Sequence, residues 1–99
     1  MNIRIKAVKF DADSKLEDFI QKKVNKLGRF FDDIINAEVF LKLENSADLE
    51  NKVVEVKLDI PGSDLFARRQ TKSFEESTDE VVNALKQQIL KHKEKLRGI

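Results

Sequence analysis

The chain contains no cysteine, one histidine, one proline and only three glycines. Without cysteine there is no disulfide, no thiolate nucleophile and no cysteine-ligated metal, and the composition fits a reducing compartment. The glycines, at positions 28, 62 and 98, are too far apart to form a phosphate-cradling loop. Long apolar runs are also missing, so neither a signal peptide nor a membrane-spanning segment is expected. We therefore expect a cytoplasmic protein with no membrane partner.

Groups that perform chemistry are few in this sequence. His92 is the only histidine, and a metal site needs more ligands than the chain can gather around it. The acidic pairs Asp32-Asp33, Glu75-Glu76 and Asp79-Glu80 do not converge, because adjacent residues on a helix point about 100° apart. No residue stands in a recognisable nucleophile–base pattern. We expect no catalytic residue, no metal, no cofactor and no small-molecule substrate.

Charge is distributed unevenly along the 99 residues, which are enough for a single domain over residues 1–99. Net charge is only +1, yet residues 1–30 hold eight Lys/Arg against four acids and residues 81–99 hold five against one. Residues 31–80 hold six Lys/Arg against thirteen acids. This segregation predicts one basic face and favours a nucleic-acid partner. The alternative interpretation is that the lysines only solvate the backs of helices.

Four segments alternate between apolar and polar residues, which is the pattern of half-buried β-strands. They cover residues 2–9, 36–44, 52–60 and 65–71. The residues predicted to face the core are Ile3, Ile5, Ala7, Ala37, Val39, Leu41, Leu43, Val54, Val56, Leu58, Ile60, Leu65 and Ala67. Phe40, Val53 and Phe66 are predicted to face the opposite, open side. Pro61-Gly62 suits the two central positions of a type II turn between the last two strands.

Two segments show helical periodicity instead. The first begins at Asp13 or Ser14, and the spacing of Ser14 and Glu17 favours Ser14 as the N-cap. It ends at Leu27, with Gly28 in the left-handed C′ position. The second runs over residues 73–97, and begins with the capping-box pattern Ser-x-x-Glu. Acids fill its first turns and cations its last turns, which complements the helix macrodipole.

The order β-α-β-β-β-α predicts an α+β fold, a four-stranded mixed sheet with two helices packed on one face. The first two strands are expected to be parallel and the remaining pairs antiparallel. Because both helices cover the same face, their solvent-facing backs lie side by side. The two cationic surfaces are then expected to merge into one.

Three parts of the chain match one known family. They are the segment 88–95 (Gln-Ile-Leu-Lys-His-Lys-Glu-Lys), the first helix with Leu16, Phe19, Ile20, Lys22-Lys23 and Leu27, and Pro61-Gly62 followed by Leu65-x-Ala67. Together, over nearly the whole chain, they resemble the ribosome hibernation-promoting factors, also called ribosome-associated inhibitors or the sigma-54 modulation protein family. Because no dimerisation domain follows Ile99, the chain resembles a short form of that family, expected to be monomeric away from the ribosome.

The resemblance implies a translation inhibitor that binds the small ribosomal subunit in the channel for messenger and transfer RNA, near the decoding site, and promotes ribosome hibernation. Basic helix residues contact ribosomal RNA in that family, and they match Lys22, Lys23, Lys26, Lys91 and Lys93. Together with the charge pattern, the predicted RNA-binding residues are Lys22, Lys23, Lys26, Arg29, Lys86, Lys91, Lys93, Lys95 and Arg97.

The chain also departs from the family pattern. Residues 73–79 replace an Asp-Met-Tyr-Ala-Ala-Ile-Asp-like run, Gln87 stands where an arginine is common, and Ala84 stands where a lysine is common. Arg68, Arg69 and Lys72 lie on or beside the last strand, where they either extend the basic face or discourage strand pairing. Two other functions stay open from sequence: a general double-stranded RNA-binding module, and a protein-binding or oligomerising module that uses the open sheet face.

Overall fold

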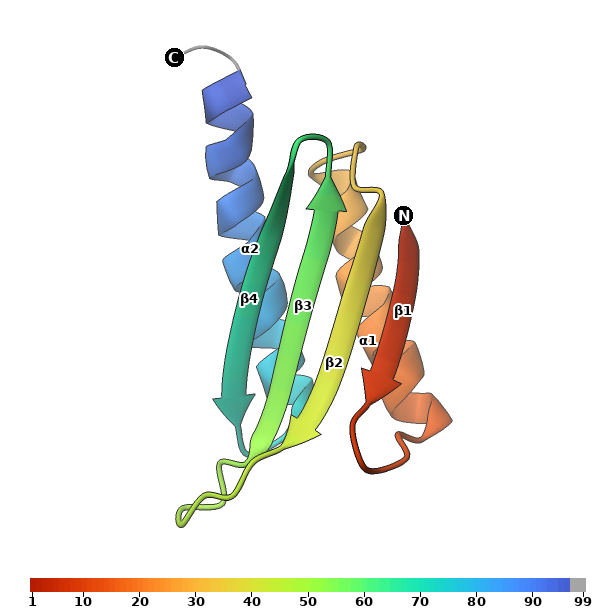
Figure 1. The fold of residues 1–99 in the computed structure, drawn as a ribbon, viewed down its shortest axis with the longest axis vertical. Coiled ribbons are helices and arrows are strands. Elements are labelled where there is room, and N and C mark those ends of the chain that lie inside the picture. Colours follow the sequence, from red (N-terminus) through yellow and green to blue (C-terminus); the bar gives the residue numbers. More distant parts are fainter. Residues whose placement is uncertain (97–99) are drawn as a thin grey trace.

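The computed structural model of the chain describes residues 1–96. Its elements follow the predicted order β-α-β-β-β-α, with one short 3-10 helix added (Figure 1). They are β1 (Asn2–Ala7), α1 (Ser14–Asn25), η1 (Lys26–Arg29), β2 (Asn36–Leu43), β3 (Lys52–Ile60), β4 (Ser63–Thr71) and α2 (Phe74–Leu96).

The strands form one sheet in the order β1-β2-β3-β4. The β1–β2 pair is parallel, and the β2–β3 and β3–β4 pairs are antiparallel. Both helices lie behind the sheet in Figure 1, and one hydrophobic core joins them to the strands. Ile20 of α1, Val56 of β3 and Leu85 of α2 are fully buried in this core. The predicted α+β architecture is confirmed.

The two ends of α1 differ from the prediction. The backbone N–H of Leu16 donates to Oδ1 of Asp13 at 2.8 Å, so Asp13 and not Ser14 is the N-cap. At the other end the chain tightens into η1, and Gly28 does not adopt a left-handed conformation. A 3-10 turn satisfies helix-end carbonyls by itself, as in the 3.0 Å bond from the Phe30 N–H to the Leu27 carbonyl, so no glycine cap is needed.

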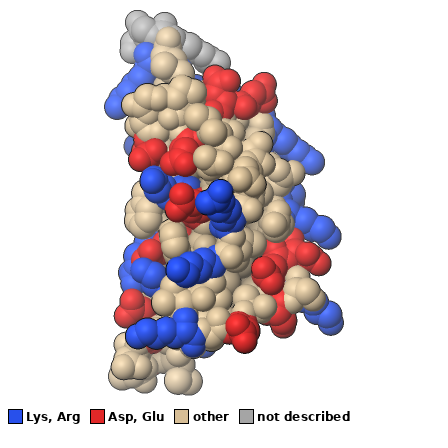
Figure 2. All heavy atoms as spheres, turned by 45° about the vertical axis from the view of Figure 1, so that its right-hand side comes forward, with Lys and Arg blue, Asp and Glu red and all other residues tan. Residues whose placement is uncertain are grey.

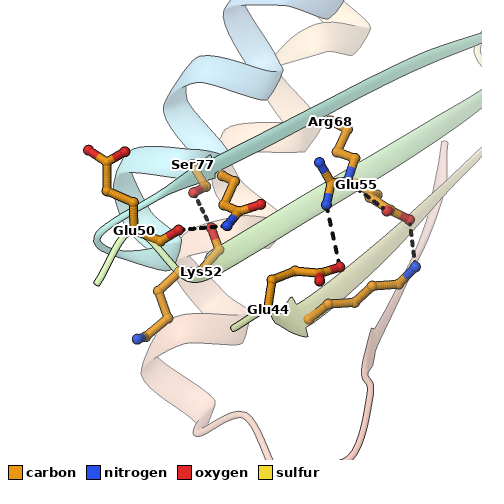
Figure 3. Close-up of polar contacts among 8 residues, drawn as sticks. Glu44, Glu50, Lys52, Glu55, Arg68 and Ser77 are labelled. Carbon is orange, nitrogen blue, oxygen red and sulfur yellow. Dashed lines mark hydrogen bonds and ion pairs between the residues drawn. The ribbon is translucent and has the colours of Figure 1, made fainter. Parts of the chain in front are cut away.

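The start of α2 is tied to the sheet through hydroxyl groups. The Glu76 N–H donates to Oγ of Ser73 at 3.0 Å, as the capping box predicts, but the Ser73 N–H donates to Oγ1 of Thr71 instead of to Glu76. The Ser77 hydroxyl donates to the Lys52 carbonyl at 2.7 Å (Figure 3). It also lies 2.8 Å from the Thr71 hydroxyl. These bonds fix the first turns of α2 against β3 and β4.

Two apolar side chains differ from the prediction in burial. Val53 is fully buried although strand alternation puts it on the open face, where it lies between its register neighbours Lys42 and Gln70. The Gln70 side chain donates to the Glu50 carbonyl at 2.7 Å, which holds the β2–β3 loop close to this position. Leu43, the last residue of β2, is 52% exposed, because the strand ends there.

The β3–β4 hairpin follows the prediction at its turn, and β4 places two consecutive arginines on opposite faces of the sheet, because side chains alternate along a strand. Gly62 has φ of 78°, as the second central residue of a type II turn requires, and β4 begins directly after it at Ser63, earlier than predicted. Arg68 faces the open side, where it contacts Glu55 (Figure 3). Arg69 faces the helices, with Nε 3.9 Å from Oε1 of Glu80. The prediction that one of the two arginines turns to the helix side is confirmed.

Candidate nucleic-acid interface

The helices run in the same direction, so their like-charged ends lie at the same end of the molecule (Figure 1). The first turn of α1 holds Glu17, and that of α2 holds Glu75 and Glu76. The last turn of α1 holds Lys22 and Lys23, and that of α2 holds Lys93 and Lys95. Each arrangement favours its own helix macrodipole. Because the helices are parallel, the result is a layer with one acidic end and one basic end.

The cations of α1 and η1 surround a solvent-open hollow of about 750 Å³. Lys22, Lys26 and Arg29 are exposed at its rim. Lys23 also lines it, but its Nζ lies 3.0 Å from Oδ1 of Asp79 on α2 and 5.4 Å from the centre of the Phe19 ring. Lys23 is therefore partly neutralised by α2, whereas Lys22, Lys26 and Arg29 are exposed to solvent.

Two lysines of α2 contact the segment that follows η1. Nζ of Lys86 lies 4.7 Å from the centre of the Phe30 ring, which is a cation–π contact. Nζ of Lys93 donates to the carbonyl oxygen of Phe30 at 2.9 Å. A second hollow is lined by Arg29, Phe30 and Lys93, among other residues, so Arg29 borders both hollows. We call Lys22, Lys26, Arg29, Lys86 and Lys93 the helix-side basic cluster.

Two of the remaining predicted cations, Lys91 and Lys95, do not join this cluster. Lys91 and Lys95 each lie two residues from Lys93, which places them about 160° around α2 from it. Both are exposed. The expected merging of all helix cations into one surface is therefore wrong for these two lysines. Arg97 lies outside the described residues.

The other positions singled out from the sequence have ordinary surroundings. His92 packs edge-on against Phe31, with ring centres 5.6 Å apart. Ala84 is half-buried, and Gln87 is exposed. No three His, Asp or Glu side chains gather to hold a metal within residues 1–96, and neither helix of that range is long and apolar enough to cross a membrane.

On the open sheet face, one cation each of β2, β3 and β4 lies beside a carboxylate. Lys42 and Arg68 lie 3.1 Å and 3.2 Å from the Glu55 carboxylate, and Lys57 lies 3.7 Å from Asp59. Basic and acidic groups are accordingly interspersed in the view of Figure 2. In the β2–β3 loop, hydrogen bonds from the Ser46 hydroxyl and the Glu50 N–H lower the pKa of the Asp48 carboxyl. This loop lies apart from the helix-side basic cluster.

Sequence reasoning missed the internal partners of three predicted RNA ligands. It found Lys23, Lys86 and Lys93, but neither the pairing with Asp79 nor the contacts with Phe30. The seven-residue spacing of Lys86 and Lys93 does indicate one side of a helix. Their partner lies up to 63 residues away in the sequence, and local periodicity carries no information on such a contact.

Comparisons with known proteins agree with this architecture. The chain is 33% identical over 98 residues to the ribosome hibernation promotion factor of Bacillus subtilis. The aligned region covers 97% of this chain and 50% of the relative. The chain is also 28% identical over 95 residues to the ribosome hibernation promoting factor of Azotobacter vinelandii. This aligned region covers 96% of this chain and 85% of the relative. The chain thus spans about half of one relative and most of the other.

Two solved structures share the fold. A ribosomal subunit interface protein from Coxiella burnetii superposes with a TM-score of 0.84 at 22% identity, over 94% of this chain and 98% of the other. The N-terminal domain of Protein Y from Thermus thermophilus superposes with a TM-score of 0.78 at 23% identity, over 90% of this chain and 96% of the other. The family model described as sigma 54 modulation protein / S30EA ribosomal protein matches residues 3–97, and the chain belongs to that family.

Proposed function

We propose that this protein binds the small ribosomal subunit through ribosomal RNA and stops translation by occupying the channel for messenger and transfer RNA near the decoding site. The proposal is supported by family membership and by the names of the relatives from Bacillus subtilis and Azotobacter vinelandii. Binding without catalysis, in the cytoplasm, is sufficient for this function, since an occupied channel excludes the other RNAs.

One observation carries the proposal: three exposed cations, Lys22, Lys26 and Arg29, rim a single hollow on the helix side. Folded RNA presents closely spaced phosphates, and every phosphate that a cation neutralises releases counterions. Cations on a rigid helix keep their spacing, so they match a folded RNA surface at a lower entropic cost than loop lysines do.

Charge reversal tests this proposal. In the double variant Lys22→Glu/Lys26→Glu, we expect affinity for purified small ribosomal subunits to fall by about 100-fold at 0.1 M salt, because two phosphate contacts are replaced by repulsion. Cosedimentation with small subunits over a series of salt concentrations measures the loss. The wild-type protein is expected to sediment with the subunit at low salt and to dissociate at high salt.

A matched control separates location from net charge. Lys6 on the open sheet face and Lys72 ahead of α2 are both exposed, and Lys6→Glu/Lys72→Glu changes the net charge by the same amount. We expect it to retain most of the wild-type affinity. Equal losses in the two double variants contradict a localised interface. Equal affinity of the wild type for free RNA duplexes and for small subunits favours the general double-stranded RNA-binding module instead.

A further inference from the structure

The segment that carries Arg29 is held in place by the C-terminal half of α2. Lys86 lies over the Phe30 ring, Lys93 donates to the Phe30 carbonyl, and His92 packs edge-on against Phe31. These three side chains come from the last three turns of α2. Lys86 and Lys93 hold the ring and the backbone of Phe30, the residue directly after Arg29, and His92 holds the next residue, Phe31.

Exposure divides the helix-side basic cluster into two groups. Lys22, Lys26 and Arg29 are exposed, whereas Lys86 and Lys93 are only partly exposed. A lysine that already donates to a carbonyl, or lies on an aromatic face, exchanges one favourable contact for another when it turns to a phosphate. The exposed cations exchange only water and counterions, so a phosphate contact gives them the larger net gain.

We propose that Lys86 and Lys93 are positioning residues, which hold Phe30 so that Arg29 completes a phosphate-binding rim with Lys22 and Lys26. This inference rests on the proposed function and refines it. Within the helix-side basic cluster, the direct phosphate contacts come from α1 and η1, and Lys86 and Lys93 of α2 supply the support behind them. Without that support Arg29 still carries its charge, but binding must then order the segment, which costs conformational entropy.

Salt dependence and coupling distinguish a positioning lysine from a phosphate ligand. For Lys22→Met we expect affinity for small subunits to fall by about 8-fold at 0.1 M salt, and the slope of log K against log salt to become shallower by about 0.7–0.9. For Lys93→Met we expect a several-fold loss of affinity with an unchanged slope. In an Arg29→Met background, Lys93→Met should cause no further loss, whereas Lys22→Met should cause its full loss. Lys93→Arg keeps a donor at this position and should restore binding.

The opposite pattern overturns the inference. If Lys93→Met makes the slope shallower by as much as Lys22→Met does, and its effect adds fully to that of Arg29→Met, then Lys93 is itself a phosphate ligand. The same measurements on Lys86→Met decide the role of the second lysine.

Hydrogen exchange in the free protein gives a readout that needs no ribosome. The Phe30 N–H, bonded to the Leu27 carbonyl, should exchange faster in Lys93→Met and Lys86→Met than in the wild type or in Lys22→Met. Unchanged exchange at Phe30 overturns the positioning role. If the wild-type protein fails to bind small subunits, the proposed function is overturned, and the exchange result still decides whether the two lysines hold Phe30.

Discussion

The two faces of the molecule carry cations in opposite arrangements. On the open sheet face, antiparallel pairing sets Glu38 opposite Lys57 and Glu55 opposite Arg68. The like-charged pair Asp59 and Asp64 lies next to Lys57, within 4 Å of its Nζ. In the helix layer, like charges gather, because parallel helices with dipole-compensating ends put their cations at the same end. Cross-strand pairing therefore cancels charge over β2, β3 and β4 on one face, and helix direction concentrates cations at one end of the other.

This difference teaches where a polyanion finds an attractive surface. Lys42, Lys57 and Arg68 of the sheet each have a carboxylate within 4 Å. Around the hollow of α1 and η1, the exposed cations outnumber the carboxylates. We therefore expect a positive potential at the basic end of the helix layer, although the net charge of the whole chain is only +1.

The largest expected effect concerns packing on the two sides of the sheet. Leu85, on the helix side, is fully buried, and Leu85→Ala should lower the free energy of unfolding by about 2–5 kcal/mol, since it leaves a cavity. Phe66, on the open face, is 52% exposed, and Phe66→Ala should cost about 1 kcal/mol or less. Urea denaturation of both variants measures the difference. Equal losses would show that the open face is covered in solution.

An intermediate effect is expected for the hydroxyl that ties α2 to the sheet. Ser77 is fully buried, and Ser77→Ala removes the hydrogen bond to the Lys52 carbonyl and the one shared with the Thr71 hydroxyl, which keeps its two bonds to Ser73. We expect a loss of about 1–3 kcal/mol in the free energy of unfolding. High salt should not change this loss, because the bonds are between neutral groups. Thr71→Val in the same background tests the pairing, since two neighbours of one network should not add.

The smallest effect is expected on the open face, and it addresses charge cancellation directly. Glu44→Gln/Glu55→Gln removes the carboxylates next to Arg68 and Lys42. The ion pairs are solvent-accessible, so the loss of stability should be about 1 kcal/mol or less and should vanish in 1 M salt. Nonspecific affinity for single-stranded RNA should rise by a few-fold at low salt. Unchanged RNA affinity would show that cancellation by these carboxylates does not limit binding to this face.

Much of the fold was predictable because its signals are local. Alternation over residues 52–60 and the Pro61-Gly62 turn define a hairpin from neighbouring residues alone. The errors lie at element ends, where alternatives are nearly equal in energy. Asp13 and Ser14 are both good N-caps, and the backbone selects between them only once the entry angle of the chain is fixed. Gly28 likewise permits a left-handed cap without requiring it.

The burial errors have a different origin. Val53 has the expected side of the strand but not the expected exposure: it lies between Lys42 and Gln70, and Gln70 of the neighbouring strand bonds the Glu50 carbonyl of the β2–β3 loop just before Val53. The protein-binding alternative, which needed Val53 as an exposed apolar contact, loses that residue. Strand periodicity gives the face on which a side chain lies, and only the fold determines what covers it.

The sequence by itself determined the order of elements, the shared core face of both helices and the concentration of cations on them, because these follow from periodicity and helix-end chemistry. Only the tertiary structure decided which of those cations are available to a partner. Lys23 meets Asp79, and Lys93 meets the carbonyl of Phe30, while Lys22 and Lys26 point to solvent. A lysine has the same charge in every case, but contacts between segments far apart in sequence determine whether its charge is already engaged.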